Sequence, residues 1–585
     1  MSTYETKSMA ISTMLTAIKE GNIAIPEIQR PFVWNSIKVR DLMDSMYRGF
    51  PIGFIITWRS ADTRLKDGTI SSGKSIIIDG QQRITAITAA MVGHEVLNKN
   101  YQKKRIRIAF NPLEERFEVC TPALEKSKRW IPDISKLYSE TFNQWQFIND
   151  YVAQNDGVDG NTVASVLSNL INMKNIQVGV IELSSEIEID IVTEIFTRIN
   201  SKGVSLSQSD FVMSKIASNT EYSGVNIRKA IDYFCHALES PKDFARIKQN
   251  DKEFVSSYLF EKIKWVEGHK TFSYIPKYAD MIKVIYAYKF QRGKISQLVQ
   301  LLSGRDFSTK EYRDEVAGES FKAFEEGLID FCNKNNFENY TMILRSMGIN
   351  DFNHIRSINA LNFGYILYLL LKDQKIEVQK REHIVRRFVM LSLLTQRFSG
   401  SSESQIDFDV RRFIEHDAEA YLESVEATEL SSAYWDYTLI QRLETNQIGP
   451  IHYIYLFTQV VNQDKGFLSH PISVQSMLDM HGDIHHIFPK NYLQKNGVTD
   501  KKDYNQIANY AMVQKEINIK ISDKAPKDYL ELLSISKEDE QSLQNFKDNA
   551  VPTELFDMDI NDYQEFLKLR RQLMATKIKD YYYSL

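Results

Sequence analysis

Residues 76–87 read Ile76-Ile77-Ile78-Asp79-Gly80-Gln81-Gln82-Arg83-Ile84-Thr85-Ala86-Ile87. The three isoleucines predict a short buried strand. Asp79-Gly80 predicts a sharp turn, because glycine accepts backbone angles that other residues avoid. From Gln82 onward the apolar residues follow helical spacing. The stretch therefore predicts a strand, a tight turn and a helix, with the polar side chains gathered where the turn opens.

This arrangement is typical of a phosphate-handling site. Where a strand opens onto a helix N-terminus, free backbone N–H groups point outward, and α/β proteins hold phosphates there. An acid, two amides and an arginine suit a metal ion, an attacking water and a phosphate. The alternative is a polar turn in which Arg83 forms a surface ion pair, and the spacing alone favours neither interpretation.

Size and composition indicate a globular protein of several domains. The chain has 585 residues, 43% of them hydrophobic, and a net charge of −4, so any nucleic-acid contact must come from a local basic surface. Its three cysteines are far apart and lack zinc-site spacing, which argues against a disulfide framework and for a reducing compartment. The strongest apolar run, residues 363–371, is too short to cross a bilayer. We therefore expect a cytoplasmic protein with no membrane contact.

The order of predicted elements suggests three domains. A helix is expected over residues 9–19 from its apolar spacing, and strand-like segments recur among the first 219 residues. From about residue 220 to 395 the pattern is mostly helical, and the small polar residues 399–404 read as a linker. The predicted domains are therefore residues 1–219, 220–398 and 399–585. The predicted class is predominantly α, with an N-terminal α/β domain.

A pair of histidines near the C-terminus provides the second candidate site. His485 and His486 lie in the run DIHHIFPK, Asn509 follows His486 by 23 residues, and Asn518 follows nine residues later. This order resembles the HNH, or ββα-metal, nuclease motif, in which two strands and a helix bind one divalent cation. The resemblance implies a ββα core embedded in the helices of the C-terminal domain.

The motif implies a role for each of these residues. The residue before the catalytic histidine binds the metal and the histidine deprotonates water, which makes His485 a metal ligand and His486 the general base. The middle residue, Asn509, orients or stabilises the hairpin, and Asn518 is the second metal ligand. Phosphodiester hydrolysis needs an activated water and a cation, here Mg²⁺ or Mn²⁺. Imidazole, with an unperturbed pKa of ~6.5, is a suitable base near neutral pH.

Two departures from the motif leave alternatives open. The first ligand is more often acidic, so Asp483 or His481 is an alternative to His485. Asn505 also competes with Asn509 for the middle role.

The surrounding segment is basic, which supports a nucleic-acid substrate. Residues 490–527 contain eight lysines and four acidic residues, a net charge of +4 in a chain whose net charge is −4. Lysines contact phosphates whatever the base sequence. The competing interpretation is a helix and loop surface with two structural histidines.

Two sets of motifs resemble the GmrSD-like type IV, modification-dependent restriction enzymes. The segments that resemble their N-terminal domain are PEIQRPFVW (26–34), IIIDGQQRITAI (76–87) and EIFTRINSKGVSLS (194–207). The segments that resemble their C-terminal HNH-type nuclease domain are HHIFPKNYL (485–493) and IANYAMVQKEINIKISDKAPKDYL (507–530). The resemblance covers both ends of the chain and the helical middle only loosely.

This resemblance implies a ParB- or sulfiredoxin-like N-terminal domain that hydrolyses a nucleoside triphosphate, namely GTP, ATP, CTP or UTP. The implied nucleotide-site residues are Gln29, Arg30, Asp79, Gly80, Gln81, Gln82 and Arg83. Asp79 could orient water or hold Mg²⁺, while Arg83 and Arg30 neutralise phosphate charge. Arg198 and Asn200 are weaker candidates, since a helix end before a glycine loop is more typical of a cap. The chain has no Walker A motif, so a P-loop site is not expected.

Together these patterns predict a modification-dependent DNA endonuclease of antiphage defence, in which nucleotide hydrolysis regulates metal-dependent cleavage. The expected partners are double-stranded DNA, modified phage DNA in particular, and a nucleoside triphosphate; homo-oligomer formation is left open. One alternative is a nucleotide hydrolase with an inactive nuclease domain that acts by nucleotide depletion. The other is a non-enzymatic, ParB-like DNA-binding scaffold.

Overall fold

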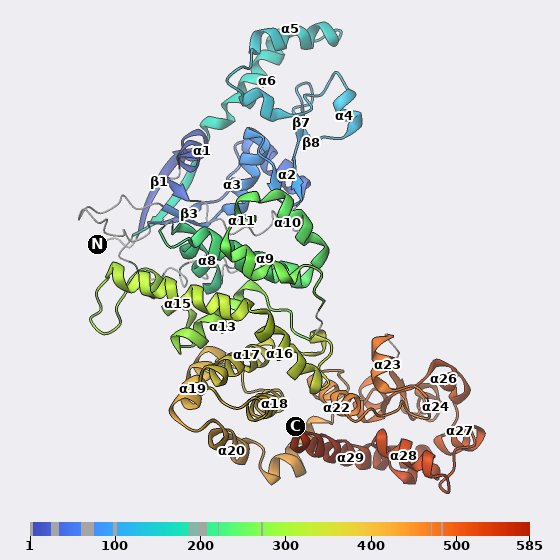
Figure 1. Cartoon of the computed structure of the whole chain (residues 1–585). Helices are drawn as coiled ribbons and strands as arrows, with labels where there is room; N and C mark the ends of the chain where they lie inside the picture. Colours follow the sequence, from blue (N-terminus) through green and yellow to red (C-terminus); the bar gives the residue numbers. More distant parts are fainter. Residues whose placement is uncertain are drawn as a thin grey trace. The chain divides into compact units, whose positions relative to one another are not determined.

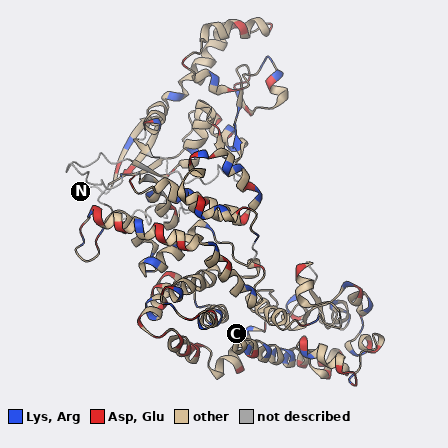
Figure 2. Ribbon diagram, in the orientation of Figure 1, with Lys and Arg blue, Asp and Glu red and all other residues tan. Residues whose placement is uncertain are grey.

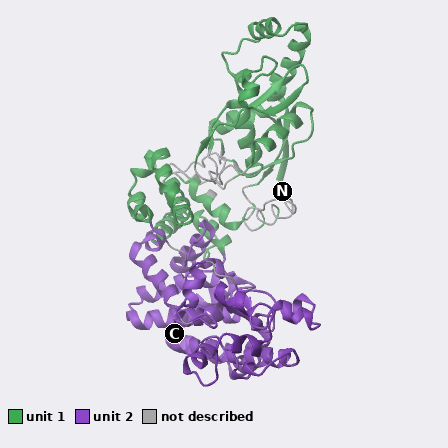
Figure 3. Ribbon diagram, turned by 90° about the vertical axis from the view of Figure 1, so that its right-hand side faces the viewer, with its two compact units in different colours: residues 1–268, 295–326 green, residues 269–294, 327–585 purple. Residues whose placement is uncertain are grey.

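A computed structural model describes most of the chain. The residues outside the description are 1–3, 21, 25–33, 60–74, 98–101, 185–186, 188–190, 192–194, 196–206, 220, 271–272, 470 and 481–483. The chain splits into two compact units (Figure 3), one formed by Met1–Gly268 with Ile295–Glu326 and the other by His269–Lys294 with Gly327–Leu585. The three predicted domains stay predictions.

The first unit is built around a five-stranded mixed sheet in the order β1-β9-β3-β4-β2. Strand β3 runs parallel to β9 and antiparallel to β4, while β2 is parallel to β4 and β1 antiparallel to β9. The strands are β1 (Tyr4–Ala10), β2 (Ile23–Ala24), β3 (Ile55–Arg59), β4 (Ser75–Asp79) and β9 (Gln177–Leu183). The predicted strand and helix at residues 76–87 are confirmed as β4 followed by α3 (Gln81–Ile87).

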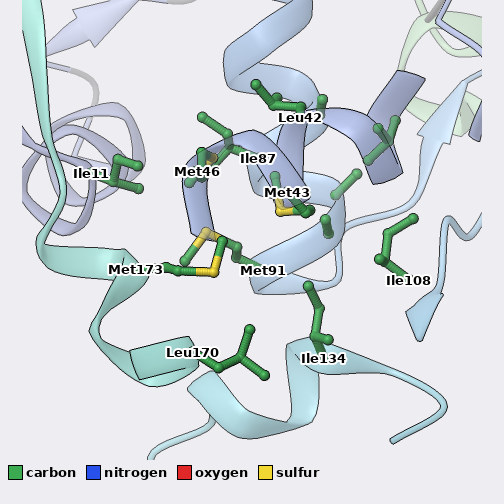
Figure 4. Packing of buried hydrophobic residues seen from close by; sticks show 14 of the residues in the cluster. Ile11, Leu42, Met43, Met46, Ile87, Met91, Ile108, Ile134, Leu170 and Met173 are labelled. Carbon is green, nitrogen blue, oxygen red and sulfur yellow. The ribbon is translucent and has the colours of Figure 1, made fainter. Parts of the chain in front are cut away.

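The sheet and the helices of this unit share a hydrophobic core, which includes Ile77 of β4 and Val180 of β9. Figure 4 shows other members of the same cluster, among them Met43 of α2 and Ile87 of α3. The elements of the first unit outside the sheet are α1 (Ile11–Lys19), α2 (Ser36–Tyr47), α3, β5 (Val96–Leu97), β6 (Lys103–Lys104), β7 (Ile108–Asn111), β8 (Arg116–Val119), α4 (Pro122–Lys126), α5 (Gln144–Gln154), α6 (Gly160–Asn172), α8 (Gln208–Ser218), α9 (Gly224–Glu239), α10 (Phe244–Asn250), α11 (Lys252–Val255), α12 (Tyr258–Ile263) and α14 (Ile295–Leu302). Figure 1 shows α1, α2 and α3 beside the sheet.

A buried carboxylate ties four strands of the sheet together. Glu182 on β9 accepts hydrogen bonds from Lys7 of β1 (2.8 Å), Arg59 of β3 (3.0 Å) and Ser75 of β4 (2.7 Å). Burial alone would raise the pKa of Glu182, but Lys7, Ser75 and Arg59 hold it below its usual value. The negative charge is therefore matched within the sheet, as a buried charge must be.

In the residues that the structure describes, the regular elements of the second unit are helices and one short antiparallel strand pair. Helix α15 (Asp314–Cys332) contributes residues to both units. The helices of the second unit are α13 (Tyr278–Phe290), α16 (Lys334–Ser346), α17 (Ile358–Asp373), α18 (Val378–Thr395), α19 (Ser402–Glu415), α20 (Ala418–Glu429), α21 (Leu439–Arg442), α22 (Pro450–Val461), α23 (Val474–Asp479), α24 (Lys490–Lys495), α25 (Lys501–Tyr504), α26 (Lys515–Ile521), α27 (Pro526–Leu532), α28 (Glu540–Asp548) and α29 (Tyr563–Ser584). The strands β10 (Ile484–His486) and β11 (Tyr510–Met512) pair antiparallel. The chain is thus predominantly α, as predicted.

Two local predictions are wrong. The helix expected over residues 9–19 begins at Ile11, because Met9 and Ala10 belong to β1 and pair with β9. The linker expected over residues 399–404 is already helical from Ser402, since α19 buries Ile406, Val410 and other apolar residues at helical spacing. No helix in the described residues is both long and apolar enough to span a membrane.

Candidate functional site

The first candidate site lies where β4 ends and α3, labelled in Figure 1, begins. Asp79 is the last residue of the strand and Gln81 the first of the helix. Gly80, between them, has φ +97°, and a Cβ atom there would lie 2.3 Å from Cδ1 of Ile55. Any other residue would be strained at this φ and would have to displace the Ile55 side chain. The sharp turn predicted from Asp79-Gly80 therefore depends on glycine.

The Arg83 guanidinium is held by two contacts within the protein. Its Nη2 donates to Oδ2 of Asp79 at 2.7 Å, and its Nη1 donates to the carbonyl of Ile52 at 2.8 Å. Gly53 has φ +84°, and a Cβ there would lie 2.4 Å from Nη1 of Arg83. The side chains of Arg83 and Asp79 are 18% and 27% exposed, so both can still be reached by solvent. Arg83 therefore forms an ion pair, as the interpretation of this stretch as a polar turn expects. Its role in nucleotide binding stays a prediction.

Both neighbouring amides, Gln81 and Gln82, are half-buried. Gln81 turns back and donates from Nε2 to the carbonyl of Ile77 at 3.1 Å. The parallel pairing of β2 with β4 matches Ala24 with Ile76, so both strands run toward the edge of the sheet where Asp79 lies. The other predicted nucleotide-site residues lie outside the described residues; they are Gln29, Arg30, Arg198 and Asn200.

The second candidate site is an antiparallel hairpin followed by a helix. In β10 and β11, His485 pairs with Ala511 and His486 with Tyr510. Helix α26 begins three residues after β11 and contains Asn518. The elements therefore follow one another as strand, strand and helix, with α24 and α25 inserted between the strands.

His486 is anchored at one ring nitrogen. Its Nε2 lies 3.0 Å from Oδ1 of Asn505, and its ring meets the ring of Tyr510 edge-on with 5.1 Å between centroids. Burial lowers the pKa of His486 below its usual 6.5; the Asn505 contact raises it, and Lys490 and His485 lower it further. The imidazole is therefore favoured in its neutral form, which a general base requires.

Asn509 fixes the loop that follows β10. It is completely buried, accepts from the backbone N–H of Phe488 at 2.8 Å and donates to the Phe488 carbonyl at 3.1 Å. A further hydrogen bond runs from its Nδ2 to the Tyr504 carbonyl at 3.3 Å. Its amide is thus fully used by backbone groups, which fits the stabilising role considered from the sequence. The two competing asparagines have different partners, a division that spacing alone could not show.

The metal-binding prediction is not tested by these contacts. Among the described residues, no group of three His, Cys, Asp or Glu side chains could hold a metal ion. The predicted ligands are one imidazole, His485 on β10, and one amide, Asn518 on α26. The alternative ligands His481 and Asp483 lie outside the described residues.

Seven of the eight lysines in residues 490–527 are exposed, and Lys524 is half-buried. Within residues 490–527, three lysines pair with carboxylates, namely Lys495 with Asp523, Lys502 with Asp500 and Lys527 with Asp559. Five make no ion pair with a described residue; they are Lys490, Lys501, Lys515, Lys520 and Lys524. Elsewhere both signs of charge are interspersed over each unit (Figure 2). The local basic surface expected from the sequence is therefore largely free to contact phosphate.

Sequence reasoning missed three residues at these sites. The Ile52 carbonyl accepts a hydrogen bond from Arg83, 31 residues away in sequence, and Gly53 leaves room for the guanidinium. The only local signal was the segment Pro51-Ile52-Gly53, which is typical of a turn. Tyr510 packs on His486, but nothing in its spacing distinguishes it from an ordinary strand residue.

Comparison with known proteins supports the predicted resemblance for the N-terminal part. Residues 11–217 match the family model described as GmrSD restriction endonuclease, N-terminal domain. The chain is also 23% identical over 620 residues to a protein of Methanocaldococcus jannaschii named "Uncharacterized protein MJ0686", with 96% of each chain covered. The family-model match includes the Asp79–Arg83 site, so this part of the chain is similar to that N-terminal domain. The match ends before the histidine hairpin.

Proposed function

We propose that the chain is a metal-dependent DNA endonuclease of antiphage defence, in which hydrolysis of a nucleoside triphosphate in the N-terminal unit regulates cleavage of modified phage DNA. The observation that carries the nuclease half is the strand–strand–helix arrangement in which one asparagine contacts His486 and another fixes the adjoining loop. The similarity of residues 11–217 to a restriction endonuclease domain supports DNA as the substrate.

His486 is the proposed general base. Its imidazole is neutral near pH 7 because burial lowers its pKa, and it takes a proton from the water that attacks the phosphodiester. Asn509 keeps the loop after His486 in place through both backbone groups of Phe488. Lys515 and Lys520, exposed on α26, contact DNA phosphates irrespective of base sequence.

Mg²⁺ or Mn²⁺ is the proposed cofactor, with His485 and Asn518 as its protein ligands. The amide oxygen of Asn518 is a ligand that these cations prefer, whereas the imidazole of His485 is more usual for softer cations. The donor set therefore fits in part, and Asp483 or His481 remains an alternative ligand. A bound cation would stabilise the charge that develops on the phosphate and on the leaving oxygen.

The proposed nucleotide site is the turn at Asp79–Arg83, with Gln29 and Arg30 beside it. Arg83 is fixed in direction by Asp79 and the Ile52 carbonyl, which leaves its remaining N–H groups to neutralise phosphate charge. Gly80 lets the backbone turn sharply at this point. GTP, ATP, CTP and UTP are the candidate substrates.

Plasmid cleavage tests the nuclease half. Modified and unmodified plasmids are incubated with the full chain, with Mg²⁺ or Mn²⁺ and with each triphosphate in turn. We expect His486→Ala to abolish cleavage and preserve nucleotide hydrolysis, while His416→Ala, an exposed histidine at the end of α19, keeps both. Cleavage of modified DNA by His486→Ala at the wild-type rate would refute the assignment of the base.

Phosphate release tests the nucleotide half. Asp79→Asn removes the charge that pairs with Arg83 but keeps the shape of the side chain. We expect it to abolish turnover of every triphosphate while thermal unfolding of the protein changes little. Turnover retained by a purified Asp79→Asn variant would show that this turn is only a structural ion pair.

A second candidate function is nucleotide hydrolysis with an inactive nuclease domain. It is favoured by the extent of the family-model match, which covers residues 11–217 with the Asp79–Arg83 turn and ends before the histidine hairpin. Calorimetric titration with Mn²⁺ separates the two possibilities. Binding that is lost in both His485→Ala and Asn518→Ala supports an active nuclease, and absence of binding supports the second candidate.

A further inference from the structure

The hydrogen bond between His486 and Asn505 determines which ring nitrogen is available for catalysis. Oδ1 of Asn505 lies 3.0 Å from Nε2 of His486. An amide oxygen can only accept, so Nε2 carries the imidazole proton and the lone pair lies on Nδ1. Nδ1 makes no hydrogen bond to any residue that the structure describes. The structure therefore leaves Nδ1 as the basic atom.

Asn505 is itself held in place on both sides. It ends helix α25, where its backbone N–H donates to the Lys501 carbonyl at 3.1 Å. The next residue, Gln506, donates to the Lys502 carbonyl at 2.6 Å and accepts from Arg571 of α29 at 3.0 Å. Because the backbone around Asn505 is fixed by these contacts, its side chain loses little conformational entropy when the amide oxygen is held toward His486.

The roles of the two asparagines are separate. Asn509 has both ends of its amide bound to the backbone of Phe488 and does not contact His486 among the described contacts. Asn505 makes the contact with the ring. Loss of Asn509 would therefore disturb the loop, whereas loss of Asn505 would disturb the orientation and tautomer of the base.

We propose that Asn505 is a positioning residue that fixes His486 in the Nε2–H tautomer, so that Nδ1 receives the proton of the attacking water. This inference rests on the proposed nuclease function. As the water proton passes to Nδ1, the water oxygen forms a bond to phosphorus and the bond from phosphorus to the ester oxygen breaks. The leaving oxygen takes a proton from solvent water. Asn505 still accepts the hydrogen bond from Nε2 after the imidazole becomes charged, so the same hydrogen bond orients both the neutral and the protonated ring.

The tautomer can be observed without any reaction. Two-bond ¹H–¹⁵N NMR spectra of the full chain, labelled with ¹⁵N-histidine, distinguish a protonated Nε2 from a protonated Nδ1, and His486→Gln assigns the signal. We expect the Nε2–H tautomer in the wild type, a mixture in Asn505→Leu, and the Nε2–H tautomer again in Asn505→Asp, which retains an acceptor. Asn496→Leu is the matched control, because Asn496 ends helix α24 and its side-chain amide donates to the Tyr492 carbonyl of the same helix and to no other described residue.

Cleavage kinetics provide the second measurement. We expect Asn505→Leu to lower kcat about 10- to 100-fold, part of the contribution of a general base, with little change in KM for DNA. Asn505→Asp should recover most of the rate, and Asn496→Leu should match the wild type. If Asn505 had only a structural role, Asn505→Asp would not restore both kcat and the Nε2–H tautomer of His486.

The outcomes separate this inference from the function on which it rests. An Nδ1–H tautomer in the wild type overturns the inference whether or not DNA is cleaved, and so does an Asn505→Leu variant that keeps both tautomer and kcat. The Nε2–H tautomer in a wild type that cleaves no DNA refutes the nuclease function and leaves the placement of Asn505 intact. If Asn505→Leu fails to fold, the wild-type and Asn505→Asp spectra still decide.

Discussion

Replacing His452 by leucine is expected to make the second unit less sensitive to acid. His452 lies on α22 with 2% of its surface exposed, and neither ring nitrogen has a hydrogen-bond partner among the described residues. Burial lowers its pKa from 6.5 to about 4, with smaller contributions from the charges of Arg570 and His354. The folded state therefore resists a proton that the unfolded chain accepts readily.

The sign and size of the effect follow from these two pKa values. Because the pKa of His452 is lower in the folded state than in the unfolded chain, the free energy of unfolding is unaffected by this histidine above pH 6.5. It falls as the pH drops from 6.5 toward 4, where the unfolded chain binds a proton that the folded state does not. For this pair of values the loss is about 2 kcal/mol at pH 5 and about 3 kcal/mol well below pH 4. His452→Leu lacks this loss. At pH 8 it should be as stable as the wild type or up to ~2 kcal/mol more stable, because a buried polar group without partners is removed.

Hydrogen exchange of α22 peptides across a urea series, measured by mass spectrometry at pH 8 and pH 5, reports the stability of this helix alone. That is needed because a chain with two compact units is not expected to unfold in one step. Thr458→Val is the matched control. Thr458 is buried on the same helix and bonds to the Tyr455 carbonyl, so its loss should lower stability about equally at both pH values. If His452→Leu loses as much stability between pH 8 and pH 5 as the wild type, the reasoning is refuted.

Three further changes should have defined effects. Gly80→Ala should destabilise the first unit by about 1–3 kcal/mol in urea unfolding, because it forces a strained φ of +97°; an unchanged midpoint would contradict the steric account. Asn509→Leu should cost about 1–3 kcal/mol, since both backbone groups of Phe488 lose a partner, and exchange at Phe488 should rise accordingly. Asp409→Asn should cost about 1.5–3 kcal/mol, because Arg397 loses the charge of a carboxylate 2.6 Å away and keeps only its ion pair with Glu429; a thermal midpoint within a degree of the wild type would contradict that.

Local patterns predicted the parts of the fold that local forces determine. The strand, turn and helix at residues 76–87 appear where the apolar spacing and the Asp79-Gly80 pair indicate them. The helix pattern over residues 9–19 extended two residues too far, because pairing with β9 takes Met9 and Ala10 into the sheet. That pairing spans about 170 residues of sequence, and the mostly exposed β1 shows no alternating apolar pattern.

The candidate nuclease site shows the same limit. The sequence spacing identified His486, Asn505 and Asn509 as candidate site residues, but it could not decide which asparagine has the middle role of the motif. Their partners are fixed by how α25 and the loop after β10 fold back on one another, since Asn509 binds Phe488 while Asn505 meets the imidazole. Both side chains carry the same amide, so only three-dimensional contacts distinguish a residue that stabilises a loop from one that orients a ring.

Arg83 shows how a structural and a functional interpretation of one residue can both hold. A guanidinium has five N–H donors in a fixed plane, and the contacts with Asp79 and the Ile52 carbonyl use one on each of two nitrogens. The remaining donors are then directed by the protein before any phosphate arrives, which reduces the entropy lost on binding. Gly53 and Gly80 have no side chain to prevent this close approach. The internal ion pair is therefore compatible with a phosphate-binding role, because it orients the same group that a phosphate would meet.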